Sequence, residues 1–293
     1  MRQSAALTPI RKRQREVGMS TSALESLQDH DTLPPLPYVA HEILLAANRE
    51  EPDIAEVSDK LAREPGLSAR VVAMANSAFF AGQQPLYSIQ HAIMRLGLVR
   101  VRVLAASVLL NKLFDPGRCP AFSAPRYWHD AIATSYTATR LAPHLAPSDT
   151  ADAAYISGLL HNIGLLLLVH FFPGPMNEVL GEYGRRPEQS LVALTRSALG
   201  CDHGEAGRLL LKAWELPEPV VAVASHFHSP HYRGEHAELV HLVRHAAEWH
   251  EAGFELPEAH PLNRALPAAV RATEARHCQR ETERLAAFAR LLA

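Results

Sequence analysis

The apolar residues of this chain recur at the spacing of an α-helix along most of its length, and no segment alternates apolar and polar residues as a half-buried β-strand does. Proline and glycine interrupt the pattern at intervals, because both residues disfavour helix interiors. The sequence therefore predicts an all-α protein of roughly a dozen helices. The predicted ranges are residues 39–47, Pro52–Leu61, Leu67–Ala78, Ile89–Leu96, Leu98–Phe114, Arg126–Leu145, Ala151–Val169, Pro187–Ala198, His203–Trp214, Pro217–His226, Ala237–Glu251 and Arg271–Leu292.

The composition favours a globular protein without a polyanionic partner. Of the 293 residues, 47% are hydrophobic, and 29 basic residues oppose 31 acidic ones to give a net charge of −2. The most apolar stretches, Val101–Leu110 and Ile163–Phe172, are shorter than the roughly 18 residues of a membrane span. No signal peptide is recognised, and three cysteines without a CxxC spacing favour a reducing compartment. We therefore expect a cytoplasmic location.

A short basic run, Arg11–Arg15, lies in a polar tail that spans residues 1–28. Such a run is usually solvated and disordered. A nucleic-acid contact through it would depend steeply on salt, because it would rest on phosphate groups. We expect a solvated tail rather than a nucleic-acid partner.

The motif Gly158–Gly164 contains the adjacent pair His161 and Asn162, in an apolar run that predicts a buried helix. A histidine next to an aspartate would be a metal-ligand pair, since imidazole nitrogen and carboxylate oxygen both bind divalent ions. Asparagine keeps an acceptor oxygen but lacks the charge. Much of the functional interpretation depends on that missing charge.

Seven short motifs occur between Thr32 and Pro230. They are Leu33–Pro37, Arg63–Leu67, Ala75–Ala78, Ala92–Gly97, Gly158–Gly164, His203–Gly207 and Trp214–Pro217. In this order they resemble the HDOD family, a branch of the HD superfamily of metal-dependent phosphohydrolases. The resemblance implies an N-terminal helical bundle packed on an HD-like helical core. It also implies a signalling or regulatory module, mostly non-catalytic and often found in bacterial pathways.

Four regions are expected on this basis. Residues 1–28 form the tail, residues 29–118 the N-terminal bundle, residues 119–235 the HD-like core, and residues 236–293 a C-terminal helical extension. The bundle and the core together make up the HDOD domain, 29–235. The loop Asp115–Pro120 marks their boundary, because its proline and glycine residues end the preceding helix.

The resemblance also assigns candidate metal ligands. HD enzymes use several histidines and two aspartates, one of which bridges two metal ions. His161, His203 and His228 stand at histidine positions and are the candidate ligands. Asn162 stands at the bridging aspartate, and Arg244, which stays protonated and cannot bind a metal, stands at the final one. A binuclear site is therefore expected to be lost.

The sequence leaves the alignment with the family histidines open at two positions. The upstream helix histidine of the family falls on His129 or, one residue later, on Asp130. The later His-His pair falls on Phe227 and His228, and His226 takes part only with a register shift. The residues expected to line a ligand pocket are His129, Asp130, Asn162, His226 and Arg244.

Arg244 has two interpretations. Its guanidinium can bind a phosphate or carboxylate bidentately in a pocket that has lost its metals. The simpler alternative is a salt bridge to Asp130, Asp152 or Glu205.

A second histidine group, His236, His241 and His245 with Glu238, lies on one predicted helix. His241 and His245 share a helix face because four residues separate them. Trp249 continues the same stripe, so a packing face is expected rather than a metal site.

The expected function is that of a non-catalytic HDOD regulatory protein, which acts through contacts with signalling proteins and is gated by a small anion such as a nucleotide. The alternative is a metal-dependent phosphohydrolase or phosphodiesterase with an atypical mononuclear site. No cofactor is expected beyond at most one weakly bound divalent metal, and neither membrane nor nucleic acid is an expected partner.

Overall fold

A computed structural model describes residues 23–28, 33–45, 54–62, 65–77, 84–146 and 153–289, and every regular element in these ranges is a helix. The predicted all-α class is thereby confirmed. The basic run Arg11–Arg15 lies outside the described residues.

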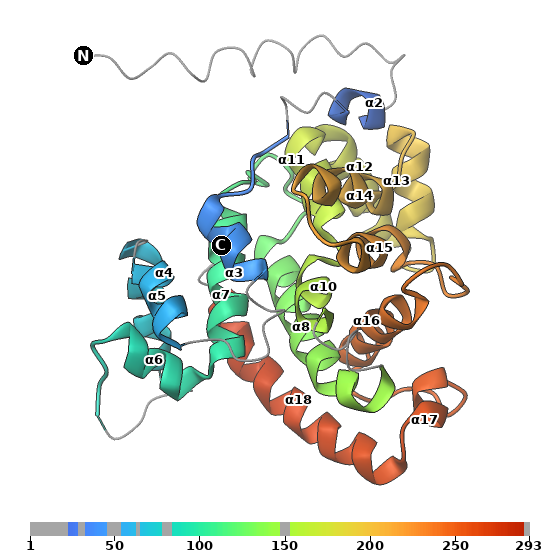
Figure 1. The fold of residues 1–293 in the computed structure, drawn as a ribbon. Coiled ribbons are helices and arrows are strands. Elements are labelled where there is room, and N and C mark those ends of the chain that lie inside the picture. Colours follow the sequence, from blue (N-terminus) through green and yellow to red (C-terminus); the bar gives the residue numbers. More distant parts are fainter. Residues whose placement is uncertain are drawn as a thin grey trace, which may run out of the picture.

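Helices α3 to α6 form a small bundle at the left of Figure 1 and along α7, whereas α2 lies at the top of the figure and packs on α14. Helix α2 lies within residues 1–28, so the last part of the expected disordered tail is a helix instead. Helix α3 packs on α7, and α4 and α5 both pack on α6. The predicted bounds of α6 are confirmed, because the Ser88 hydroxyl accepts the amide proton of His91 at its start and Gly97, with φ +84°, ends it. The helices are α2 (Ala23–Leu27), α3 (Tyr38–Leu45), α4 (Ile54–Ala62), α5 (Pro65–Ala75), α6 (Ile89–Leu96) and α7 (Leu98–Asn111).

A long central helix, α8, organises the rest of the molecule, because α10, α16 and α18 all pack against it (Figure 1). Behind this layer, α11 packs on α14 and α14 on α15. The helices are α8 (Ala124–Leu145), α10 (Ala154–Leu160), α11 (Ile163–Phe171), α12 (Pro173–Arg185), α13 (Leu191–Leu199), α14 (His203–Ala213), α15 (Glu218–His226), α16 (Ala237–Glu251), α17 (Pro261–Ala265) and α18 (Ala268–Ala289).

The observed helices differ from the predicted ones in several bounds, in three helices that were not predicted (α2, α12 and α17) and in one break. The single helix expected over Ala151–Val169 is broken into α10 and α11 by a turn at His161 and Asn162. Helix α12 was not predicted, because its start at Pro173 lies in a Pro-Gly-Pro sequence that indicates a break. Proline is tolerated in the first turn of a helix, where its missing N–H has no intrahelical acceptor.

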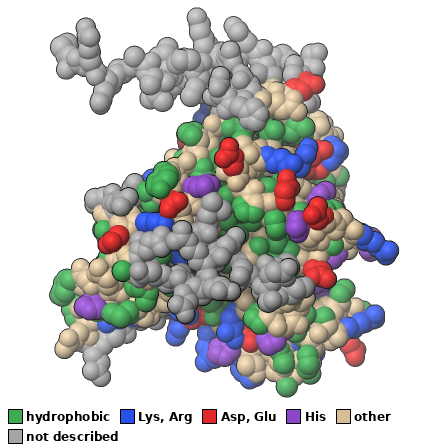
Figure 2. Space-filling model, in the orientation of Figure 1, with side chains coloured by type: hydrophobic (Ala, Val, Ile, Leu, Met, Phe, Trp, Pro, Cys, Tyr) green, Lys and Arg blue, Asp and Glu red, His purple; other side chains and the backbone are tan. Residues whose placement is uncertain are grey.

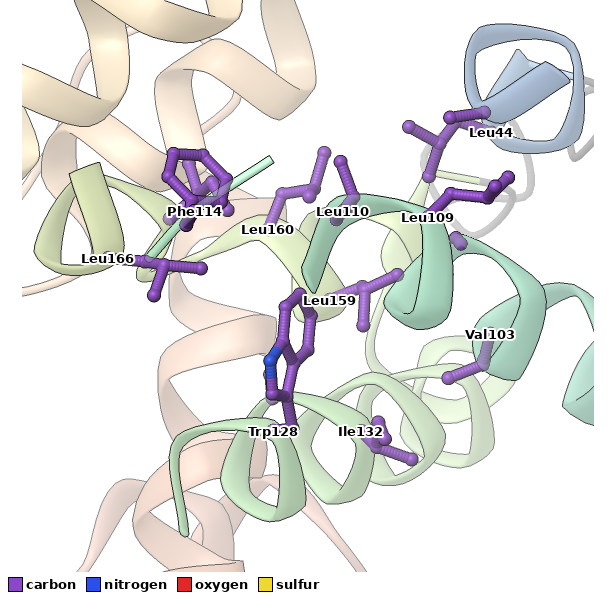
Figure 3. Close-up of a cluster of buried hydrophobic side chains, with 14 of the residues drawn as sticks. Leu44, Val103, Leu109, Leu110, Phe114, Trp128, Ile132, Leu159, Leu160 and Leu166 are labelled. Atoms are coloured by element: carbon purple, nitrogen blue, oxygen red, sulfur yellow. The ribbon is translucent and has the colours of Figure 1, made fainter. Parts of the chain in front are cut away.

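One hydrophobic core joins the N-terminal bundle to the later helices. Leu110 of α7, Trp128 of α8 and Leu159 of α10 all point into it (Figure 3). The Trp128 indole N–H donates to the Asn111 side-chain oxygen at 2.7 Å, so the one polar atom of this large ring is paired. The core thus fixes α8 and α10, which carry site residues, relative to α7.

The segment Ala154–Phe171 is long and apolar enough to cross a membrane by length and hydropathy. In the structure 83% of it is buried inside the protein, and the turn at His161 and Asn162 divides it. It serves as the core of this fold.

Candidate functional site

Three glycines bring the site helices unusually close together. A Cβ atom at Gly158 would lie 2.6 Å from the Cα of Ser135 on α8, and one at Gly204 would lie 2.7 Å from the Ser225 carbonyl oxygen on α15. A Cβ at Gly164 would lie 1.8 Å from the carbonyl oxygen of His203. No larger residue fits at these contacts, because the facing atoms belong to the backbone. The ends of α10, α14 and α15 therefore meet around His161 and His203.

His161 lies at the end of α10 and is only 7% exposed. Its Nδ1 lies 2.7 Å from the Gly158 carbonyl oxygen, so Nδ1–H donates and Nε2 keeps its lone pair. Its ring packs on Phe227 at a centroid separation of 4.5 Å. Burial lowers the pKa of His161 to about 4, with smaller opposing effects from the Gly158 carbonyl and Asp130. This imidazole is neutral at pH 7.

His203 and His228 form a direct pair, because their Nε2 atoms are in hydrogen-bond contact. One ring must donate and the other accept, so the two cannot both be protonated. Burial lowers the pKa of His203 to about 4. His228 is exposed when the whole residue is considered, but its imidazole ring contacts the ring of His203. Its pKa is lowered by burial of the ring and then by His203, His161 and Arg244.

Asp130 of α8 lies beside two histidines, its neighbour His129 and His250 of α16. The Asp130 Oδ1 atom lies 3.4 Å from His129 Nδ1 and 3.4 Å from His250 Nε2. Although burial opposes it, the two histidines together lower the pKa of Asp130 to about 2. The register that the sequence left open therefore places both His129 and Asp130 beside His250.

Asn162 and Arg244 each leave a buried polar atom without a partner. The Asn162 Oδ1 and Arg244 Nη1 atoms have no hydrogen-bond partner within the described residues. Arg244 Nε donates to Glu248 Oε1 at 2.8 Å, one helical turn along α16. The expected salt bridge thus forms with Glu248 and not with Asp130 or Glu205. Asp152 lies outside the described residues.

Glu205 and Asp130 do not pair with Arg244, because each of them has other partners. The Glu205 carboxylate accepts the backbone N–H of Asp202 at 2.9 Å and completes the capping box of α14. Arg196 pairs with both Asp202 and Glu205. The start of α14, where His203 lies, is therefore fixed by local acids that are not available to Arg244.

His226 points away from the histidine pair. Its ring stacks on Tyr232 at 4.1 Å with an interplanar angle of 13°. His241 and His245 share a face of α16 as their spacing predicts, with ring centroids 6.3 Å apart, and the His241 Nε2–H donates to the Tyr232 carbonyl oxygen at 2.8 Å. His245 meets Glu248 and His260.

Two groups in the described part of the chain bring three potential metal-binding atoms within 4.8 Å of one another. They are His129, Asp130 and His250, and His245, Glu248 and His260. The predicted set His161, His203 and His228 is not among these groups and stays a prediction. Sequence reasoning missed His250, Glu248 and His260, because only the helix crossing and the turn before α17 bring them to their partners.

The residues do not fit a pair of metal ions held as in HD enzymes. A bridging position needs an anionic oxygen to offset the repulsion of two dications, and Asn162 offers only a neutral amide. The Arg244 cation is close enough to lower the pKa of His228, so it would repel a dication at that histidine. Asn162 and Arg244 therefore stand where a binuclear HD site needs two carboxylates.

Comparisons with known proteins agree with this architecture. An uncharacterised protein of Treponema pallidum (strain Nichols) is 27% identical over 229 residues, which are 76% of this chain and 43% of that protein. The structure of a candidate signal transduction protein of Marinobacter aquaeolei VT8 superposes with a TM-score of 0.76 at 23% identity. It covers 97% of this chain and 64% of that one. The chain therefore spans less than two thirds of the length of these two relatives.

A further solved structure is that of a candidate phosphohydrolase of Shewanella amazonensis SB2B. It superposes with a TM-score of 0.69 at 24% identity and covers 94% of this chain and all of its own. At these identities the likeness concerns the fold. The HDOD domain family model matches residues 33–230, well over half of the chain, and the protein therefore belongs to the HDOD family.

Proposed function

We propose that this protein is a non-catalytic, cytoplasmic HDOD signalling protein that acts through contacts with other proteins, and that its HD pocket binds a small anion in place of metals. The observation that carries the proposal is the Nη1 atom of Arg244, which is buried without a partner. A buried guanidinium N–H normally has an acceptor, because leaving it unpaired costs roughly 1–3 kcal/mol or more. A phosphate or carboxylate oxygen would supply that acceptor.

The neighbouring histidines support an anion rather than a cation. His203 Nδ1 is also buried without a partner, and it can carry a proton to donate when Nε2 accepts from His228. The Arg244 charge helps to lower the pKa of His228 and so contributes positive potential at that ring, whereas Asp202 acts in the opposite sense on His203. An anion next to Arg244 would be attracted by its charge and would accept hydrogen bonds from Arg244 Nη1 and His203 Nδ1.

Contacts with other proteins are supported by apolar side chains exposed on the N-terminal bundle. Tyr87 is 87% exposed and Met94 is 62% exposed, and both line a shallow groove of about 720 Å³ next to Arg95 and His91. Hydrophobic side chains also reach the surface in this part of Figure 2. Tyrosine and methionine are enriched in protein interfaces.

The anion proposal is tested by titrating nucleotides and cyclic dinucleotides against the wild type, Arg244→Ala and Arg276→Ala in a calorimeter. Arg276 is an exposed arginine on α18, so its variant removes the same charge elsewhere. We expect one ligand to bind the wild type and Arg276→Ala alike and to bind Arg244→Ala at least tenfold more weakly. Glu248→Gln should tighten binding, because it frees Arg244 from its present partner. No binding by the wild type refutes the anion proposal.

The second candidate function is a metal-dependent phosphohydrolase with one ion on His161, His203 and His228. Its support is the Nδ1–H of His161, which donates to a carbonyl and leaves Nε2 free to bind a metal. Metal analysis and turnover of a generic phosphodiester decide between the two. Turnover that survives purification and disappears in His161→Ala would favour the hydrolase over the regulatory protein.

A further inference from the structure

A compact group of three metal-binding side chains lies outside the HD pocket, where α16 meets the turn before α17. His260 Nε2 lies 3.0 Å from Glu248 Oε2, and His245 Nδ1 lies 3.4 Å from the same oxygen. The rings of His245 and His260 are 5.2 Å apart. All three side chains are less than one third exposed. Two histidines and a glutamate thus converge at the protein surface.

The Glu248 carboxylate is oriented by a second residue. Arg244 Nε donates to Oε1 at 2.8 Å, so Oε2 is the oxygen that faces both imidazoles. Such an arrangement is typical of carboxylates that bind a metal through one oxygen while the other accepts a hydrogen bond. Arg244 stands at the position where HD enzymes carry their final aspartate, and here it orients the carboxylate of Glu248.

The distances match a tetrahedral ion. Zinc binds imidazole nitrogen and carboxylate oxygen at about 2.0–2.2 Å, which places tetrahedral ligands roughly 3.4 Å from one another. The two nitrogen–oxygen separations, 3.0 and 3.4 Å, need shifts of only a few tenths of an ångström, and all three ligand atoms lie within 4.8 Å of one another. A set of two nitrogens and one oxygen suits zinc better than calcium or magnesium, which prefer oxygen ligands alone.

We propose that His245, Glu248 and His260 form a Zn²⁺ site that joins α16 to the turn before α17 and leaves the fourth position to water. The site uses other ligands than the anion pocket but shares Arg244 with it, because Arg244 pairs with Glu248. The Arg244 cation also acts against a dication bound by its partner. His245 and His260 take no part in the anion proposal, so their variants separate the two proposals. Three protein ligands with one open position are a common zinc arrangement.

One contact sets a limit on the affinity. The backbone N–H of Leu262 donates to His260 Nδ1 at 3.2 Å, so the neutral His260 ring carries its proton on Nε2. Zinc at Nε2 displaces that proton, and a neutral metal-bound ring must carry a proton on Nδ1. The Leu262 contact is then lost. We therefore expect weaker binding than at a site where the second ring nitrogen donates a hydrogen bond.

The test uses the untagged full chain, freed of metal with EDTA and titrated with Zn²⁺ and with Co²⁺ as a spectroscopic probe. His245→Gln, Glu248→Gln and His260→Gln remove one ligand each. His241→Gln, on the same helix but bonded to Tyr232, is the matched control, and His161→Gln controls for the HD pocket. Thermal melts without metal confirm that each variant is folded.

We expect one Zn²⁺ equivalent and a tetrahedral Co²⁺ spectrum in the wild type, His241→Gln and His161→Gln. Binding should weaken at least tenfold in each ligand variant, and Zn²⁺ should raise the melting temperature of His241→Gln but not of His260→Gln. The proposal is overturned if the wild type takes up no zinc equivalent. It is equally overturned if His161→Gln abolishes uptake while His245→Gln and His260→Gln bind normally.

Discussion

Two buried histidines, His161 and His203, are expected to make the stability of this protein depend on pH. Burial lowers the pKa of each to about 4, whereas a histidine in the unfolded chain has a pKa of about 6.5. Between these values the unfolded chain binds more protons, so acid favours unfolding. The stability is complete above pH 6.5 and falls as the pH decreases toward 4, by on the order of 2 kcal/mol per histidine at pH 5.

Urea unfolding in EDTA at pH 7.5, 6.0 and 5.0 measures this effect on the metal-free protein. Replacing His161 by Gln should reduce the loss at pH 5 by on the order of 2 kcal/mol, because glutamine does not titrate. His91→Gln, at an exposed position on α6, should leave the profile unchanged. A His161→Gln profile identical to the wild type would show that this histidine is not buried in its neutral form.

Contacts between side chains could be predicted from the sequence only where short motifs fix the spacing of the residues. The count placed Phe227 and His228 at the His-His position, and in the structure Phe227 packs on His161 and His228 contacts His203. Glu248 was not foreseen as the partner of Arg244, since it lies one turn further along a helix that the family motifs do not reach. Contacts between distant elements depend on the packing of helices, which residue spacing does not reveal.

The crossing of α11 and α14 depends on the absence of a side chain at Gly164. Replacing Gly164 by Ala would put a methyl group 1.8 Å from the His203 carbonyl oxygen and 2.4 Å from the Gly207 amide nitrogen. Backbone atoms cannot rotate away, so the two helices must separate. We expect a loss of about 2–3 kcal/mol or more in the free energy of unfolding, measured by urea denaturation.

Gly184→Ala is the matched control for this substitution. Gly184 lies in the last turn of α12, and a Cβ there would meet no atom within 4 Å. Alanine has the higher helix propensity, so this variant should be as stable as the wild type or slightly more stable. Equal stability of Gly164→Ala and Gly184→Ala would contradict the close crossing of α11 and α14.

Helix ends were predictable where capping residues mark them, and not where tertiary packing decides them. Ser88 and Gly97 bound α6 as predicted, because both act on the backbone next to them. The break between α10 and α11 has no proline at His161 and Asn162, and its apolar flanks continue the helical pattern. Only the convergence of α10, α14 and α15 reveals why the chain turns there.

The C-terminal helix α18 joins both halves of the molecule, as it runs along α8 at the bottom of Figure 1. Glu274 is 6% exposed and accepts two hydrogen bonds from Arg140 of α8, both at 2.7 Å. Glu281 is 5% exposed and accepts from Arg100 of α7 at 2.7 Å. The expected extension over 236–293 is therefore tied to the bundle and to the core through buried carboxylates.

Replacing Arg140 alone and replacing Glu274 alone should lower the free energy of unfolding by unequal amounts. Arg140→Met leaves the Glu274 carboxylate buried without its main partner, so we expect a loss of about 3 kcal/mol. Glu274→Gln leaves Arg140, whose side chain is 40% exposed and can be hydrated, so about 1 kcal/mol is expected. Urea unfolding and limited proteolysis of α18 measure both. Arg185→Met, in an exposed pair with Glu182, should leave stability nearly unchanged. If Glu274→Gln proves the more damaging variant, the carboxylate is not the buried partner and α18 does not dock as described.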